Sequence, residues 1–75
     1  MADTKLKDIR TNTLHTTQEV IARRTSLSFS AYHRAETGKR VTYATATEIL
    51  KAVNGILEEQ GKQSITLEDL GLRLL

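Results

Sequence analysis

The stretch that decides the fold spans residues 17–40 and reads TQEVIARRTSLSFSAYHRAETGKR. Its first part has the features of a short helix over residues 17–24. Thr16 or Thr17 can serve as its N-cap, and Glu19 lies where a negative charge favours the first turn of a helix. We expect the buried stripe of this helix to consist of Val20, Ile21 and Ala22.

The second part predicts another helix after a tight connection. Ser28 is a suitable N-cap for a helix that continues to about Glu36 or Thr37. Gly38 can adopt the left-handed conformation that ends a helix. Only residues 25–27 separate the two predicted helices, so residues 17–37 have the pattern of a helix, a tight turn and a helix.

Helices are also expected on both sides of this stretch. The N-terminal part predicts a helix over residues 4–12, with Leu6 and Ile9 on its inner face. On the C-terminal side, apolar residues recur at helical spacing over residues 42–60, and a short last helix is expected over residues 67–70. We therefore predict an all-α fold, a compact domain of four to five helices that ends in a short extra helix or tail.

Length and composition limit the organisation of the chain. Its 75 residues are enough for a single domain over residues 1–75, and cysteine is absent, so disulfides and thiolate metal sites are excluded. The apolar runs are much shorter than the roughly 20 residues that cross a bilayer. We expect no membrane contact and a cytoplasmic location.

Charge is unevenly distributed. Residues 1–40 carry a net charge of +4 and residues 41–75 one of −2. A basic half next to an acidic half is consistent with one face that binds a polyanion, and equally with an ordinary solvated surface.

Residues 17–40 resemble the helix-turn-helix of the phage-repressor and Cro-like family of DNA-binding proteins. The resemblance rests on Thr17-Gln18 at the start of the first helix, Ala22 inside it, Ser28 before the second, and Glu36-Thr37-Gly38-Lys39-Arg40 at its end. Where the family usually has glycine in the turn, this chain has Ser26, whose Cβ would be strained at a positive φ. The resemblance implies a lambda-repressor-like fold and a bacterial or phage origin.

The resemblance also implies which residues read bases. The helix from Ser28 to Glu36 would enter the major groove, and Arg34 could form a bidentate pair with guanine. Phe29 would contact a thymine methyl group or, alternatively, would cap the core. His33 would contact a base or a phosphate, or would be a solvated surface residue. The base-reading positions implied are Phe29, Ser30, His33 and Arg34.

Contacts to phosphate hold the register of such a complex without reading sequence. The resemblance implies these contacts for Gln18, Ser28, Thr37, Lys39 and Arg40. For the Lys39 and Arg40 pair, a solvated loop is the alternative. Arg23 and Arg24 could also contact phosphate. The alternative is that they interact with the dipole of the helix whose end they occupy.

Other functional classes receive little support. The sequence places no nucleophile, base and orienting acid together and has no glycine-rich phosphate loop, so we do not expect an enzyme. His15 and His33 have no ligand partners at recognisable spacing, and no metal or cofactor is expected.

One recognition helix reads only a few base pairs, so we expect a homodimer on an inverted-repeat operator in double-stranded DNA. The predicted dimer surface lies in the tail, residues 56–75, and comprises Ile56, Leu57, Leu70, Leu72 and Leu74. The alternative is that this tail packs over its own core. The function expected is transcriptional repression. The competing hypothesis is a protein-interaction module, antitoxin-like or a regulatory adaptor, whose leucine-rich tail binds a protein partner.

Overall fold

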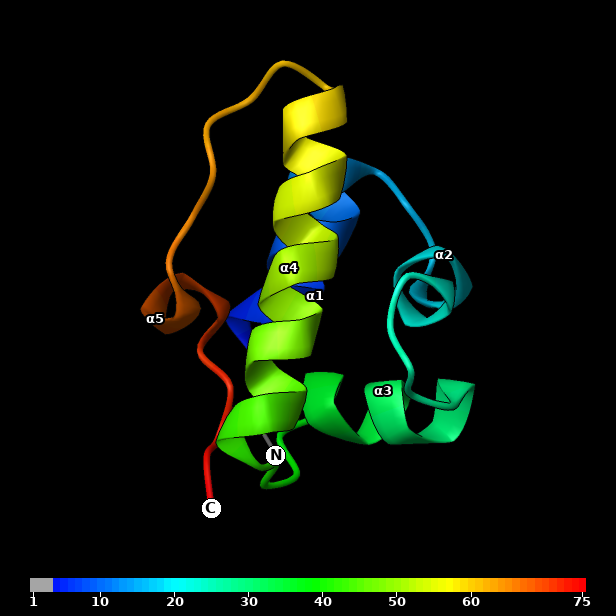
Figure 1. The fold of residues 1–75 in the computed structure, drawn as a ribbon, viewed down its shortest axis with the longest axis vertical. Coiled ribbons are helices and arrows are strands. Elements are labelled where there is room, and N and C mark those ends of the chain that lie inside the picture. Colours follow the sequence, from blue (N-terminus) through cyan, green and yellow to red (C-terminus); the bar gives the residue numbers. More distant parts are fainter. Residues whose placement is uncertain (1–3) are drawn as a thin grey trace.

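The computed structural model describes residues 4–75 and shows an all-α domain, as predicted. The elements are α1 (Lys5–Asp8), a π-helical segment η1 (Ile9–Leu14), α2 (Gln18–Arg23), α3 (Phe29–Glu36), α4 (Tyr43–Glu59) and α5 (Leu67–Leu70). The long helix α4 forms the centre (Figure 1). In that view α2 and α3 lie on one side of α4, and α5 with the C-terminal tail lies on the other.

Three helices begin at the hydroxyl residues that the sequence indicates. The side chain of Thr17 accepts a hydrogen bond from the Val20 amide before α2, and that of Ser28 accepts one from the Ala31 amide before α3. Thr42 caps α4 in the same way. Each cap satisfies a backbone N–H that has no partner within the helix, and this is why the boundaries could be predicted from local residue types.

The first helix differs from its prediction. Instead of ending near Asn12, α1 continues without a break into η1 and ends only at Leu14. His15 stops it with a left-handed backbone, at φ of 52°. Leu6 and Leu14 are both buried, so this continuous segment contributes one apolar side chain to the core from each of its two parts.

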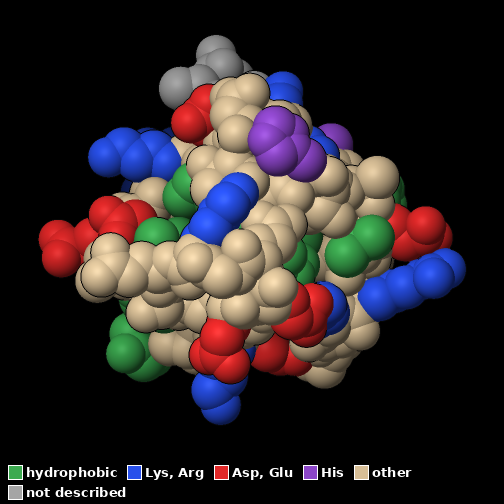
Figure 2. Space-filling model, turned by 90° about the horizontal axis from the view of Figure 1, so that it is seen from above, with side chains coloured by type: hydrophobic (Ala, Val, Ile, Leu, Met, Phe, Trp, Pro, Cys, Tyr) green, Lys and Arg blue, Asp and Glu red, His purple; other side chains and the backbone are tan. Residues whose placement is uncertain are grey.

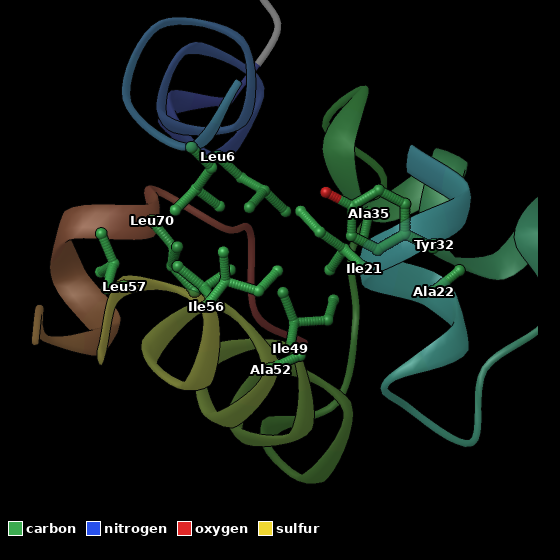
Figure 3. Close-up of a cluster of buried hydrophobic side chains, with 12 residues drawn as sticks. Leu6, Ile21, Ala22, Tyr32, Ala35, Ile49, Ala52, Ile56, Leu57 and Leu70 are labelled. Carbon is green, nitrogen blue, oxygen red and sulfur yellow. The ribbon is translucent and has the colours of Figure 1, made fainter. Parts of the chain in front are cut away.

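The core lies where α4 meets the other helices (Figure 3). Leu6, Ile21 and Tyr32 reach it from α1, α2 and α3, and Leu70 reaches it from α5. Burying an aliphatic side chain of this size contributes about 1.5–3 kcal/mol, so this cluster holds all five helices together. The contribution of α4 consists of Ile49, Ala52, Val53, Ile56 and Leu57.

Val20 does not belong to this core, contrary to prediction, because 41% of it is exposed. Ile21 and Ala22 are buried as expected. Successive residues of a helix point about 100° apart, so three consecutive side chains cannot all face inward.

The tail packs over the core of the same chain. The Asn54 side chain accepts a hydrogen bond from the Ile65 amide at 2.8 Å and donates one to the Ile65 carbonyl at 3.1 Å. Farther along, Val41 pairs with the end of the tail, donating to the Arg73 carbonyl and accepting from the Leu75 amide. These contacts hold the segment between them, which includes α5, against α1 and α4.

This packing corrects the predicted dimer surface. Ile56, Leu57 and Leu70 are core residues, so their side chains could meet a second copy only if the core opened. Leu72 is half-buried, and Leu74 is 42% exposed. Of the five residues predicted, only these two reach the surface.

Candidate nucleic-acid interface

The helices α2 and α3 are joined by a short turn at residues 24–28. Figure 1 shows α2 nearly end-on while α3 lies across the view, so the two helices cross steeply. The side of α3 that points away from the core faces solvent. Tyr32 and Ala35 are buried on the inner side of α3, the helix that packs against α1 and α2.

The turn is built without glycine. The Thr25 hydroxyl donates to the Ala22 carbonyl at 2.7 Å and accepts from the Leu27 amide at 3.1 Å. The Ser26 amide donates to the Glu48 carboxylate of α4. Within residues 4–75 the only non-glycine residue with a positive φ is His15, so the strain expected at Ser26 is not present.

All four residues predicted to read bases are exposed on α3: Phe29, Ser30, His33 and Arg34. Phe29 is 53% exposed and therefore does not cap the core. Its ring lies nearly parallel to that of His33, at an interplanar angle of 12° and a centroid distance of 6.3 Å. These side chains are available to a ligand on the solvent side of α3.

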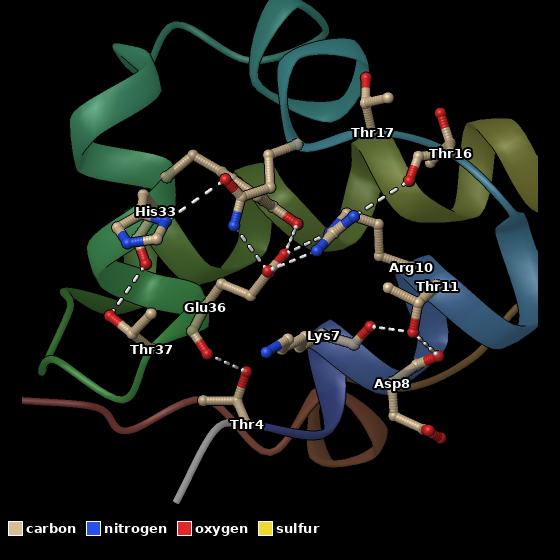
Figure 4. A network of polar contacts seen from close by, with 12 residues as sticks. Thr4, Lys7, Asp8, Arg10, Thr11, Thr16, Thr17, His33, Glu36 and Thr37 are labelled. Carbon is tan, nitrogen blue, oxygen red and sulfur yellow. Dashed lines mark hydrogen bonds and ion pairs between the residues drawn. The ribbon is translucent and has the colours of Figure 1, made fainter. Parts of the chain in front are cut away.

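A buried carboxylate fixes the inner side of α3 (Figure 4). Glu36 is fully buried, and its Oε2 accepts from Arg10 Nε and from the Tyr32 hydroxyl, both at 2.8 Å. Its Oε1 accepts from Arg10 Nη2 at 2.9 Å and from Gln18 Nε2 at 2.7 Å. The Glu36 carbonyl accepts from both the amide and the hydroxyl of Thr4. Glu36 therefore connects α3 to α2 and to the N-terminal segment.

The ionised form of Glu36 is favoured despite its burial. Burial alone would raise the pKa of this carboxyl, but the hydrogen bonds from Arg10, Gln18 and Tyr32 outweigh it and lower the pKa below its ordinary value. Burial, together with the hydrogen bond to Glu36, raises the pKa of the Tyr32 hydroxyl. The carboxylate is thus a charged acceptor with a full set of donors.

Glu36 has no role predicted from the sequence beyond its place in the motif. Its partners lie 4, 18 and 26 positions away, and only the Tyr32 partner is at helical spacing. One sequence feature could have drawn attention to Glu36: it lies inside the motif, directly after Ala35.

Gln18, which the resemblance implies as a phosphate-binding residue, already has partners within the protein. It is half-buried, and its amide is already engaged by Glu36 and, at 3.3 Å, by His33 Nδ1. A hollow of about 350 Å³ lies beside it, between the starts of α2 and α3. Arg10, Thr17, Gln18, Glu19 and Phe29 line this hollow.

The other predicted phosphate-binding residues flank the exposed face of α3. Ser28 precedes the helix and is exposed. Thr37 is half-buried, and its hydroxyl donates to the carbonyls of His33 and Arg34, which ends the helix. Lys39 and Arg40 are exposed after Gly38. With Arg34 they form the basic part of a shallow hollow of about 240 Å³ whose other lining includes Leu27, Val41 and Leu75.

Arg34, Lys39 and Arg40 differ from Arg23 and Arg24. Arg24 forms two hydrogen bonds with Glu59 of α4, at 2.8 and 2.9 Å, and Arg23 pairs with Glu19 at 3.3 Å. Among residues 4–75, no ion pair joins Arg34, Lys39 or Arg40 to a carboxylate. At the opposite end of the molecule, basic and acidic side chains lie side by side (Figure 2). Three exposed cations without an ion pair therefore lie on α3 and directly after it.

The described part of the chain, residues 4–75, contains no group of three histidine, cysteine or acidic side chains that could hold a metal ion. Within the same residues no helix has the length and apolar character needed to cross a membrane. Comparisons with protein families, with curated proteins and with solved structures found no match.

Proposed function

We propose that this protein is a sequence-specific DNA-binding regulator that inserts the exposed face of α3 into the major groove. One observation carries the proposal: Phe29, Ser30, His33 and Arg34 are all exposed on α3, while the opposite side of the same helix is held by a buried ion pair. A helix of this kind fits the major groove, where the base edges differ in their pattern of donors and acceptors.

The rigid attachment of α3 supports this function. Tyr32 and Ala35 pack in the core, and Glu36 binds Arg10 and Gln18 from two other segments. A helix that is already held in one orientation loses little freedom when it binds, so more of the contact energy is available for affinity. The reading side chains are therefore presented from a fixed backbone.

The charge pattern supports a polyanionic partner. Arg34, Lys39 and Arg40 have no carboxylate partner among the described residues. Lys39 and Arg40 can therefore neutralise phosphates, and Arg34 can approach a base, without first breaking an ion pair. Ser28, at the other end of α3, is placed to contact a phosphate with its exposed side chain. In this arrangement Arg34 reads guanine, and Lys39 and Arg40 hold the register.

The regulatory role we propose is repression by occupation of an inverted-repeat operator, with two copies of the chain bound. Leu72 and Leu74, together with Leu75, which is 78% exposed, are among the apolar side chains of the tail that remain available to a second copy. Sedimentation of the protein with and without operator tests the dimer. A strict monomer in both conditions, at high concentration, contradicts it.

Selection from a pool of random duplex DNA, followed by a salt titration of the enriched sequence, tests the proposal. We expect an inverted repeat whose affinity falls steeply with salt, because each neutralised phosphate releases counterions. The matched control is a Lys39→Ala, Arg40→Ala double variant, which should bind the same motif more weakly and with a shallower salt slope. No enrichment, with salt-independent binding of a protein to the tail, would support the interaction-module hypothesis instead.

A further inference from the structure

The amide of Gln18 lies between the buried carboxylate of Glu36 and the exposed imidazole of His33. Its Nε2 donates to Glu36 Oε1 at 2.7 Å, and its Oε1 lies 3.3 Å from His33 Nδ1. His33 is one of the residues that the proposed function assigns to base reading. A chain of contacts thus joins the buried ion pair to the surface that would meet DNA.

Glu36 determines which end of the Gln18 amide faces which neighbour. An ionised carboxylate only accepts hydrogen bonds, and Glu36 is held ionised by Arg10. The amide nitrogen, which only donates, must therefore face Glu36. The amide oxygen, which only accepts, is left to face His33.

The orientation of the amide in turn determines the tautomer of His33. An acceptor opposite Nδ1 requires that Nδ1 carry the proton. In the neutral imidazole the other nitrogen, Nε2, then has a free lone pair and acts as an acceptor. The ring cannot easily turn away from this arrangement because Phe29 stacks on it.

The Nε2 atom is available to a ligand. His33 is exposed, and in the described part of the chain the hydrogen bond of its ring is the one through Nδ1. An acceptor at this point complements bases whose major-groove edge carries an amino group, which are adenine through N6 and cytosine through N4. Guanine and thymine present only acceptors at the corresponding positions of that edge, and a neutral His33 of this tautomer would repel them.

We infer that Gln18 is a positioning residue that transmits the orientation of the Arg10–Glu36 pair to His33 and makes His33 specific for adenine or cytosine. This inference rests on the proposed function. Gln18 itself would not touch the base. It would act by fixing which nitrogen of His33 carries the proton.

Nitrogen-15 NMR of the histidine rings tests the first step without DNA. At about pH 9, above the range in which histidine ordinarily titrates, the nitrogen shifts distinguish a protonated from an unprotonated ring nitrogen. In the wild-type protein we expect Nδ1 of His33 to be protonated and Nε2 unprotonated. The exposed His15 is the internal reference. Gln18→Leu should abolish the preference, and Gln18→Ala is the second variant if the leucine disturbs packing.

The second step is tested by DNA selection with the wild type and with His33→Ala and Gln18→Leu. His33 contacts the base pair at which the His33→Ala variant no longer shows the base preference of the wild type. There the wild type should prefer adenine or cytosine by roughly ten- to hundredfold, and Gln18→Leu should reduce this preference while retaining the rest of the motif.

The outcomes separate the two proposals. Protonation of Nε2 in the wild type, or a tautomer that Gln18→Leu leaves unchanged, overturns the role of Gln18 even if the protein binds DNA. Guanine or thymine at the His33 position overturns the base assignment. Failure to enrich any sequence overturns the proposed function and the base assignment together, whereas the NMR result still decides whether Gln18 sets the tautomer.

Discussion

Arg10 and Glu36 form an ion pair of two parallel hydrogen bonds, Nε to Oε2 at 2.8 Å and Nη2 to Oε1 at 2.9 Å. They are 26 residues apart, and the pair fastens the end of α3 to η1. Only 13% of the Arg10 side chain and none of the Glu36 side chain is exposed. The orientation of α3 therefore depends on a contact that water barely reaches.

Replacing Glu36 should destabilise the fold strongly. Glu36→Gln leaves the Arg10 charge largely buried without a counterion, and breaking a buried pair in this way costs about 3–5 kcal/mol. Urea unfolding followed by circular dichroism measures the loss. The control is Glu19→Gln, which breaks the exposed pair with Arg23 and should leave the unfolding midpoint nearly unchanged. Similar midpoints for the two variants would show that the Arg10–Glu36 pair adds little to stability.

The same pair predicts how stability changes with pH. The pKa of Glu36 is lower in the folded protein than its ordinary value, so the unfolded chain binds this proton more readily. The contribution of Glu36 should therefore be complete above about pH 5 and should be lost as the pH falls through the lowered folded-state pKa. The measurement is the free energy of unfolding at a series of pH values, for the wild type and for Glu36→Gln.

Other carboxylates also contribute to the acid dependence, since the pKa values of Glu59 and Asp69 are lowered by hydrogen bonds from Arg24 and from Thr66. The difference in the free energy of unfolding between the wild type and Glu36→Gln isolates the contribution of Glu36. This difference should become smaller as the pH falls. A constant difference would mean that the charge of Glu36 is not what stabilises the fold.

Removing the N-cap of α3 should loosen that helix. Ser28→Ala deletes the acceptor for the Ala31 amide and should cost about 1 kcal/mol of stability. Amide hydrogen exchange should become faster at the first turn of α3. Ser64→Ala, in the exposed segment between α4 and α5, is the matched control. Equal exchange rates in the two variants would argue against the role of the cap.

Two substitutions should separate base reading from phosphate contact in the proposed DNA complex. Arg34→Ala should relax the preference at one base pair of each half-site, by about 1–3 kcal/mol. Lys39→Ala should weaken binding to all sequences alike and reduce the salt slope by about one. Quantitative binding to the selected operator and to its single-base variants measures both effects. Unchanged specificity in Arg34→Ala would remove Arg34 as the reader of guanine.

Phe29 and Gln18 show how far a motif predicts a site. The resemblance predicts DNA contacts for both residues, and Phe29 is exposed on α3 rather than packed in the core. For Gln18, the motif could not reveal that the amide is occupied by Glu36 and His33. Whether a polar side chain is free depends on its neighbours in space, and those neighbours are 15 and 18 residues away in the chain.

The sequence by itself determined where the helices α2, α3 and α4 begin, because Thr17, Ser28 and Thr42 bind amides only three residues ahead and no other part of the chain is needed. The tertiary structure alone decided the partners of Glu36 and the burial of Leu70. An ion pair between distant segments, or a tail that covers its own core, requires that several helices meet at once. Their meeting depends on the packing of whole faces, which local residue types do not specify.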